Sequence, residues 1–327
     1  MNESVFILSQ LDLLKKITSV VADTGNYEKI KLFKPKDATT NPTLILQAVQ
    51  NLENSNLVNN VIEKCIKNNL KDEILIDEIC DHLSVKFGIE ILKTIPGYIS
   101  TEVDASLSFN TKAQIEKALK IIKLYENEGI SKDRVLIKLA STWEGIEACR
   151  ELEKLGIKCN MTLVFNYYQA IACAQAQATL ISPFVGRILD YYVKNVPSEL
   201  PYTKFTDPGV VNVIKIYKYF KKYNYKTIIM GASFRTKEQI LGLAGCDKLT
   251  ISLKLLEELE NCYEPLERIL DSKIIENDII EKVEINENLF RWHMNEDAMA
   301  TEKLSEGIRN FNKDTLQLKE LIKNKIQ

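Results

Sequence analysis

Eight short runs of apolar or β-branched residues, most of them separated by helical patterns, constrain the fold of this chain more than any other feature. Strands that alternate with amphipathic helices form parallel βαβ units, and eight such strands favour a closed barrel over an open sheet. The second and third runs are the weakest. We therefore predict an α/β fold, a (β/α)8 TIM barrel with additional helices. The runs are ITSVVAD (17–23), KDATTN (36–41), ISTEVD (99–104), RVLIKLA (134–140), KCNMTLVF (158–165), TLISPF (179–184), KTIIMGAS (226–233) and KLTISL (248–253).

Capping residues mark where several of the helices begin. Thr111 and Thr142 are each placed to cap a helix, over residues 112–127 and 143–155 respectively. Asp207-Pro208 joins a capping side chain to a proline at the first helical position, which indicates a third helix start.

Segments outside the strand–helix repeat are predicted to be helical as well. The interval 43–98 is long enough for two or three helices, and the tail after residue 255 has a polar helical pattern. The length would suit two small domains or one barrel with insertions. Because no linker, low-complexity run or internal repeat divides the chain, we expect residues 1–327 to form a single domain.

Charge and hydropathy exclude several kinds of partner. The net charge is −2 and charges of both signs are mixed along the chain, so we expect neither nucleic acid nor a membrane surface as partner. The N-terminal apolar run is too short for a signal peptide, and no stretch approaches a membrane-spanning helix.

The cysteine and histidine content bears on location and on metals. The cysteines are odd in number and include no CxxC pair, which is typical of reduced thiols in the cytoplasm. The two histidines, His82 and His293, lie in no Cys/His cluster, so we predict no metal site. The cysteines are Cys65, Cys80, Cys149, Cys159, Cys173, Cys246 and Cys262.

Lys138, inside the apolar run VLIKLAS, is the most informative single residue. A lysine in an apolar strand is costly unless it is paired or neutral. Read alone, the segment fits a buried lysine neutralised by Asp or Glu as well as an amine that attacks a ketone to form a Schiff base. The second interpretation requires an amine that is neutral when the substrate arrives.

Other polar residues end or interrupt the strands, where active sites of such barrels lie. Asp23 and Glu102 are candidate acid/base groups, although each could instead form an ion pair at a strand end. Asn41 precedes Pro42 and has a competing role as a helix cap. The strand-end set is Asp23, Thr39, Asn41, Glu102, Asp104, Lys138, Asn160, Thr162, Ser182 and Ser233.

Two arginines follow the sixth and seventh strands, Arg187 after SPFVG and Arg235 after GASF. Barrels commonly bind phosphate in this region, and a guanidinium group binds phosphate with two parallel hydrogen bonds. Arg187 could alternatively pair with Asp190 on a surface helix. As a pair at one rim, the two arginines indicate a phosphate site.

The segments VVADTG, DATTNPTLIL, STEVDASLS, RVLIKLASTWEGI, CNMTLVF, ISPFVGRILD and MGASFR together resemble transaldolase of the pentose phosphate pathway. The resemblance runs in order over nearly the whole chain, from about residue 11 to about residue 310. It implies a (β/α)8 barrel that is a homodimer and needs no metal or organic cofactor. It also implies sugar-phosphate substrates: a dihydroxyacetone unit passes from sedoheptulose 7-phosphate to glyceraldehyde 3-phosphate, giving erythrose 4-phosphate and fructose 6-phosphate.

The resemblance further implies a role for each site residue. Lys138 matches the Schiff-base lysine, and Asp23 matches the base that takes the proton of the C4 hydroxyl. Glu102 matches the residue that moves protons through a water held with Thr162. The remaining residues match substrate contacts: Asn41, Asn160 and Ser182 for hydroxyl groups, Ser233, Arg187 and Arg235 for phosphate, with Thr39 and Phe184 also expected in the substrate site.

Two other functions stay open at this stage. A fructose-6-phosphate aldolase of the same superfamily would release free dihydroxyacetone, but those relatives have Tyr in place of Phe184 and Gln in place of Glu102. A non-catalytic barrel that binds sugar phosphates would not need Lys138, Glu102 and Asp23 together.

Overall fold

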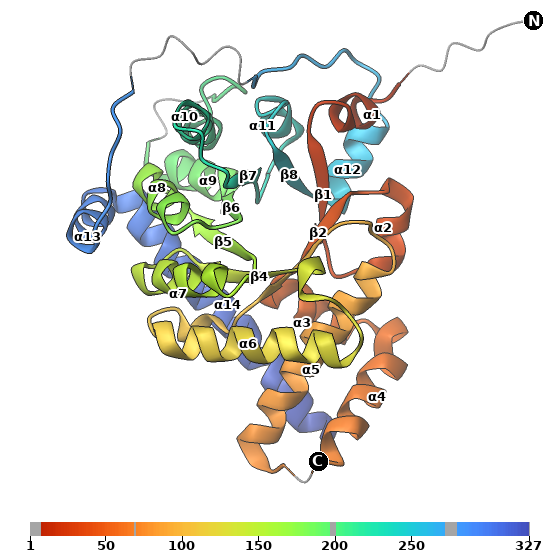
Figure 1. The fold of residues 1–327 in the computed structure, drawn as a ribbon. Coiled ribbons are helices and arrows are strands. Elements are labelled where there is room, and N and C mark those ends of the chain that lie inside the picture. Colours follow the sequence, from red (N-terminus) through yellow and green to blue (C-terminus); the bar gives the residue numbers. More distant parts are fainter. Residues whose placement is uncertain (1–7, 69, 197–200, 272–279, 327) are drawn as a thin grey trace, which may run out of the picture.

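A computed structural model describes residues 8–68, 70–196, 201–271 and 280–326 of the chain, and Figure 1 shows its fold. Eight parallel strands form a closed barrel in which each strand pairs with its neighbours in sequence and β8 pairs with β1. This confirms the predicted fold class. The strands are β1 (Ser19–Asp23), β2 (Asp37–Thr39), β3 (Ile99–Glu102), β4 (Val135–Ala140), β5 (Cys159–Val164), β6 (Leu180–Pro183), β7 (Ile228–Gly231) and β8 (Lys248–Ser252).

Helices surround the barrel and bury their apolar faces against its outer surface, as expected for this fold. Short 3-10 helices are Leu52–Asn54 (η1), Ala105–Leu107 (η2) and Lys132–Arg134 (η3). The α-helices are α1 (Gln10–Lys15), α2 (Tyr27–Phe33), α3 (Pro42–Gln50), α4 (Ser55–Ile66), α5 (Asp72–Leu92), α6 (Thr111–Asn127), α7 (Trp143–Lys154), α8 (Tyr167–Gln175), α9 (Val185–Asn195), α10 (Pro208–Lys222), α11 (Lys237–Leu241), α12 (Leu253–Glu260), α13 (Glu287–Glu296) and α14 (Ala298–Ile326).

Most helix starts lie where the sequence places them. The Thr142 side chain caps α7 by accepting from the N–H of Gly145, and Asp207 caps α10. The prediction for α6 is wrong by one residue: Asn110 is its cap, and the Thr111 hydroxyl instead donates to the carbonyl of Glu144. Asparagine is at least as good a cap as threonine, so the two neighbouring residues compete for the position.

The additional helices form a second apolar cluster beside the barrel. The interval 43–98 holds α3, α4 and α5, and α14 packs on them through Leu318 and Ile322. The tail is less helical than predicted, because the described residues 261–271 and 280–286 are not helical. In Figure 1, α14 runs from α13 past the barrel to α3 and α5.

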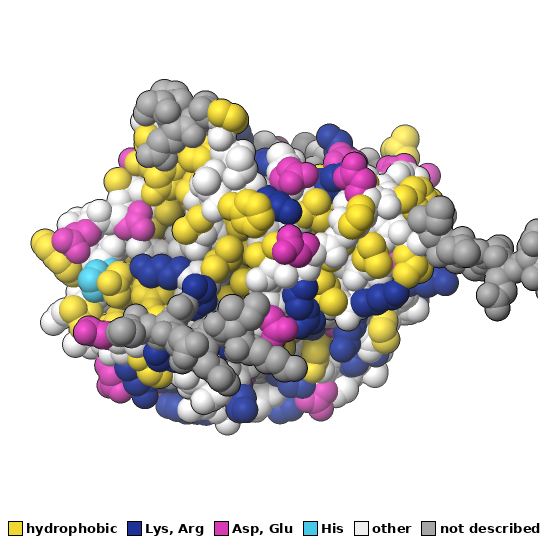
Figure 2. Space-filling model, turned by 90° about the horizontal axis from the view of Figure 1, so that it is seen from above, with side chains coloured by type: hydrophobic (Ala, Val, Ile, Leu, Met, Phe, Trp, Pro, Cys, Tyr) yellow, Lys and Arg dark blue, Asp and Glu magenta, His cyan; other side chains and the backbone are white. Residues whose placement is uncertain are grey.

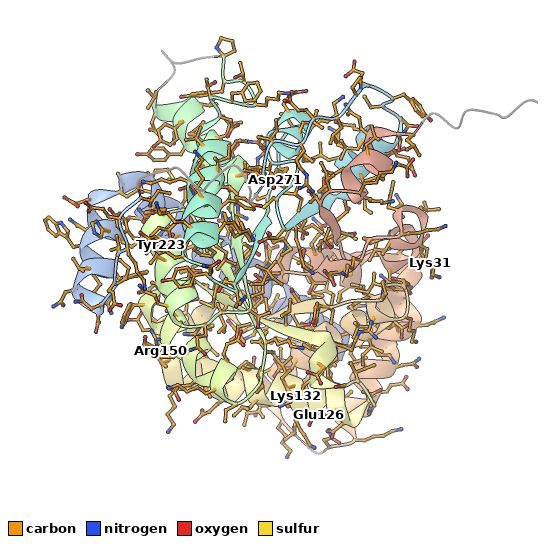
Figure 3. All side chains as sticks on the ribbon, turned by 45° about the horizontal axis from the view of Figure 1, so that its top comes forward. Lys31, Glu126, Lys132, Arg150, Tyr223 and Asp271 are labelled. Carbon is orange, nitrogen blue, oxygen red and sulfur yellow. The ribbon has the colours of Figure 1, made fainter. Side chains whose placement is uncertain are left out.

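Charged side chains of both signs are interspersed with apolar ones over the described part of the face seen in Figure 2. Lys31, at the outer edge of the helical layer in Figure 3, pairs with Glu28 at 2.9 Å while both side chains stay exposed. Such surface pairs contribute little to stability. Within the described part of the chain, no helix is long and apolar enough to cross a membrane.

Candidate active site

Lys138 lies in the middle of β4, a strand whose six residues are all buried. Its side chain is 5% exposed, and its Nζ lies 2.9 Å from Oε2 of Glu102 and donates to the carbonyl of Thr40 at 3.2 Å. The strand register explains the pairing, because Glu102 of β3 and Asn160 of β5 lie directly beside Lys138. In this structure the carboxylate contacts the amine itself.

Glu102 has the environment of a proton acceptor. Burial raises the pKa of its carboxyl group above the ordinary value of 4.5, although the nearby charges of Lys138 and Arg187 oppose this. Apart from the ion pair with Lys138, Oε2 has no hydrogen-bond partner among the described residues. Glu102 is therefore a buried carboxyl group that gains a proton more readily than an exposed glutamate.

Asp23 ends β1 and lines the same cavity as Lys138. Thr39 Oγ1 donates to its Oδ1 at 2.9 Å and also lies 2.8 Å from Oγ1 of Thr250. Burial raises the pKa of the Asp23 carboxyl, while the charge of Lys138 and the hydrogen bond from Thr39 lower it. Asp23 is thus a carboxylate that gains a proton more readily than an exposed aspartate.

Amide and hydroxyl groups extend the polar set along β5 and β6. The Ser182 hydroxyl donates to Oδ1 of Asn160 at 2.7 Å, and Nδ2 of Asn160 donates to Oγ of Ser100 at 3.1 Å. Thr162 Oγ1 is buried without a hydrogen-bond partner in the part of the chain that the structure describes. Beside it the β5 register shifts and Leu163 has φ 56°, a strained conformation for a bulky residue that marks functional sites.

Arg187 lies between two aromatic rings at the mouth. Its Cζ is 5.0 Å from the ring centroid of Phe184 and 5.3 Å from that of Phe311 on α14. Its Nη1 is buried and has no hydrogen-bond partner among the described residues. Burial lowers the pKa of the guanidinium, and the charge of Arg235 lowers it further. The two guanidinium groups repel each other, which favours an anion between them.

Asp190, which the sequence allowed as a partner of Arg187, pairs with Arg235 instead. Its Nη2 lies 2.7 Å from Oδ2 of Asp190, and its Nε also donates to that carboxylate. Its Nη1 contacts the hydroxyl of Ser233, which has φ 60° at the end of β7. Asp190 therefore orients Arg235. Arg187 forms no ion pair with Asp190.

One cavity joins most of the predicted substrate residues. Asn41 lines it and also caps α3, which confirms its competing role as a helix cap, while its contact with substrate stays a prediction. Four predicted residues lie outside this lining: Glu102, Asn160, Thr162 and Arg235. The lining is Asp23, Thr39, Asn41, Lys138, Ser182, Phe184, Arg187, Ala232, Ser233, Thr250 and Phe311.

The described residues offer one group of potential metal ligands, Cys149, Glu153 and Cys159. It lies at the start of β5, at the other end of that strand from Thr162. Oε1 of Glu153 accepts from the N–H groups of Cys159 and Thr179, so it already ties two strand starts together. This group is therefore separate from the site at the mouth.

Comparison with known proteins places this geometry in a family. The family model described as transaldolase/fructose-6-phosphate aldolase matches residues 20–322. The chain belongs to this family. It is 54% identical to a transaldolase of Saccharomyces cerevisiae over 312 residues, covering 94% of this chain and 92% of that protein. It is 53% identical to a human transaldolase (96% and 93% covered) and to a probable transaldolase of Drosophila melanogaster (97% and 96%).

Membership of the transaldolase family confirms the resemblance drawn from the motifs. The sequence interpretation missed three residues of the cavity: Ala232, Thr250 and Phe311. Thr250 interrupts the eighth run just as Thr39 and Thr162 interrupt theirs, so the same rule would have found it. Phe311 belongs to a helix outside the strand–helix repeat, and nothing in its local sequence indicates that it docks at the mouth.

Proposed function

We propose that this member of the transaldolase family transfers a dihydroxyacetone unit from sedoheptulose 7-phosphate to glyceraldehyde 3-phosphate through a Schiff base on Lys138. The observation that carries the proposal is a single buried lysine amine that lines the substrate cavity and contacts a buried carboxyl group with a raised pKa. Such a pair can exchange its proton internally, which supplies the neutral amine that attack on a ketone requires.

Schiff-base formation uses both members of the pair. Glu102 takes the proton from the ammonium group of Lys138, and the free amine adds to the C2 carbonyl of the donor sugar to give a carbinolamine. The protonated Glu102 then returns a proton to the C2 hydroxyl, directly or through a water held by Thr162, and water leaves. The product is a protonated imine on Lys138, and hydrolysis runs the same steps in reverse.

Asp23 is proposed to act in carbon–carbon cleavage. It takes the proton of the C4 hydroxyl, the C3–C4 bond breaks, and the bonding electrons move into the protonated imine. An enamine of dihydroxyacetone stays on Lys138 while erythrose 4-phosphate departs. Asn41, Asn160 and Ser182 are proposed to hold its hydroxyl groups until the acceptor aldehyde enters and the step reverses.

Arg187 and Arg235, with Ser233, are proposed to bind the phosphate of donor and acceptor alike. The unpartnered Nη1 of Arg187 and the orientation of Arg235 by Asp190 support this role. Thr39 holds Asp23, and Phe184 stacks on Arg187, so both shape the site without taking part in proton transfer.

The competing activity within the family is fructose-6-phosphate aldolase, which would release dihydroxyacetone without an acceptor. Phe184 and Glu102 stand where that type has Tyr and Gln, which supports transfer. Turnover of fructose 6-phosphate without an aldehyde acceptor, as fast as turnover with erythrose 4-phosphate, would contradict our proposal.

Borohydride reduction in the presence of fructose 6-phosphate tests the covalent step. We expect a stable adduct on Lys138, identified by peptide mass mapping, and no adduct in Lys138→Ala. Lys248→Ala is the matched control, because it removes another buried barrel lysine. Labelling at another lysine, or transfer activity that survives Lys138→Ala, would contradict the assignment of Lys138 as the Schiff-base lysine.

We further propose a cytoplasmic homodimer in which residues 1–327 form one domain. All seven cysteines are free thiols, which supports a reducing compartment. The dimer rests on the family resemblance, and light scattering of the purified protein tests it: a monomeric mass at micromolar concentration would refute it. Packing of α14 on both the barrel and the second apolar cluster supports the single domain.

A further inference from the structure

A second cavity, of about 50 Å³, lies between the end of β3 and the helices α3, α5, α6 and α14. Asn41 lines both this cavity and the substrate cavity and so forms part of the wall between them. Of the two, Lys138 lines only the substrate cavity and Glu102 lines only the second one. The carboxyl group proposed to move protons therefore borders a space outside the substrate cavity.

The walls of the second cavity carry several charged side chains beside apolar ones. Lys319 of α14 lies 2.8 Å from a carboxylate oxygen of Asp77 and 3.5 Å from one of Asp104, and Lys117 lies 2.7 Å from Asp81. Partly buried charges such as these retain hydrating water. A water needs at least about 10–15 Å³ of such space, so the cavity is large enough for a short chain of water molecules.

The proposed chemistry needs water at Glu102 when the substrate cavity is filled. One water leaves when the carbinolamine becomes the imine, and one returns when the product imine is hydrolysed. During both steps a sugar phosphate bound to Lys138 would fill the cavity that Lys138 and Phe311 of α14 both line. The mouth is then blocked on the side from which the sugar entered.

We propose that the second cavity is a water channel that connects Glu102 to solvent through the Asp104–Lys319 side, separately from the substrate mouth. This inference rests on the proposed Schiff-base mechanism and assigns a route to its water. The channel carries the water that Schiff-base formation releases and hydrolysis consumes. It takes no part in cleavage or formation of the C3–C4 bond, which involves no water.

Filling the channel from α5 tests the proposal. Ser84 lines the second cavity but not the substrate cavity, so Ser84→Leu should obstruct water without touching the sugar, and Ser84→Ala is the matched control. We expect Ser84→Leu to slow adduct trapping with fructose 6-phosphate about tenfold or more, part of the ~10²–10⁴-fold that acid–base catalysis supplies. The KM should stay unchanged and Ser84→Ala should behave like the wild type.

A single-turnover measurement separates a blocked channel from general damage. Enzyme preloaded with the dihydroxyacetone enamine is mixed with glyceraldehyde 3-phosphate. Ser84→Leu should consume the aldehyde at the wild-type rate, because bond formation needs no water, but should release fructose 6-phosphate at least about tenfold more slowly. A fall in both rates together, or in neither, overturns the channel.

Thr315→Leu fills the same cavity from α14, and Thr315→Val is its control. This pair of variants tests the channel if Ser84→Leu does not fold. Product release as fast as in the control overturns the channel while leaving the proposed function intact. Failure of the wild type itself to form an adduct on Lys138 would instead refute the proposed function, and the channel with it.

Discussion

The barrel contains two buried lysine–carboxylate pairs, one at each end. The two pairs are buried to a similar extent but differ in the groups that surround them. At the C-terminal end, Lys138 and Glu102 are both 5% exposed. At the N-terminal end, Lys248 at the start of β8 pairs with Asp37 at the start of β2, and these side chains are 9% and 5% exposed. The sequence left open that Lys138 is a buried lysine paired with Asp or Glu; the structure shows such a pair at Lys138 and a second one at Lys248, so pairing alone does not separate a structural from a catalytic lysine.

The surroundings decide what each pair can do. Oδ1 of Asp37 accepts from the N–H of Tyr98 at 2.7 Å, and the Tyr98 ring covers Lys248 at 5.5 Å. Gly97 lets the backbone approach so closely that an added Cβ would lie 1.9 Å from Oδ1 of Asp37. Oε2 of Glu102 has no second partner among the described residues, and Lys138 opens on the substrate cavity. A fully partnered pair stabilises, whereas a pair left open beside a cavity is available for chemistry.

The largest expected effect separates the two lysines by activity. Lys138→Met should lower transfer activity by at least about a thousandfold, because removal of a nucleophile eliminates the covalent path. Lys248→Met should keep activity close to the wild type at temperatures where it is folded. Coupled assays of transfer activity, with circular dichroism to check folding, test both variants. A comparable loss of activity in both would mean that the two lysines do not differ in function.

The second prediction concerns stability, for which we expect the larger loss in the Lys248 variant rather than in the Lys138 variant. Lys248→Met leaves Asp37 buried without its cation and should cost roughly 3–5 kcal/mol of unfolding free energy. Lys138→Met should cost less, because burial raises the pKa of Glu102 and the carboxyl can protonate. Urea titration of both variants gives the comparison. An equal loss in the two variants would mean that protonation of Glu102 does not offset the loss of Lys138.

The third prediction compares arginines at the two ends. Arg187→Ala should raise the KM for fructose 6-phosphate about ten- to a hundredfold, as expected for hydrogen bonds between charged groups worth ~1.5–3 kcal/mol. The KM for free dihydroxyacetone should change little. Arg134, which donates to the carbonyls of Gly97 and Ile95 near the other end, is the control. Arg134→Ala should leave both KM values unaltered. Equal rises of the KM for fructose 6-phosphate and for dihydroxyacetone in Arg187→Ala would contradict the proposal that Arg187 binds phosphate.

The smallest effect concerns the two aspartates and pH. Burial raises the pKa of folded Asp23 above 3.8, so ionised Asp23 costs stability at neutral pH, about 1.4 kcal/mol for each unit of the shift. Asp23→Asn should therefore be more stable than the wild type at pH 7, and the gain should vanish as the pH falls below 3.8. Asp37→Asn should destabilise at pH 7 because Lys248 loses its charged partner. Melting temperatures across pH test both, and a pH-independent gain in Asp23→Asn would contradict the account.

The sequence was sufficient to predict the barrel and the rim because both depend on local pattern. Strand ends in a parallel barrel meet at one edge, so polar residues such as Asp23 and Glu102 that end separate strands must converge there. Helix starts were also local, with errors no larger than the shift from Thr111 to Asn110.

Features that depend on packing between distant segments could not be read from the residues. The choice of Asp190 as partner of Arg235 depends on how α9 and β7 meet, and the direct contact of Glu102 with Lys138 depends on strand register. Phe311 is one of several apolar residues on a helical face, and only the docking of α14 distinguishes it from Leu316, which is exposed.

The position of α14 has a consequence for synthesis of the protein. A growing chain that has been translated to residue 252 already contains all eight strands. It still lacks the ring of Phe311, the Thr315 and Lys319 walls and the apolar side chains of Leu318 and Ile322. A barrel that closes early on the ribosome would therefore be a structured but inactive intermediate, and catalytic competence would appear abruptly, only when the segment around residues 311–322 has left the exit tunnel.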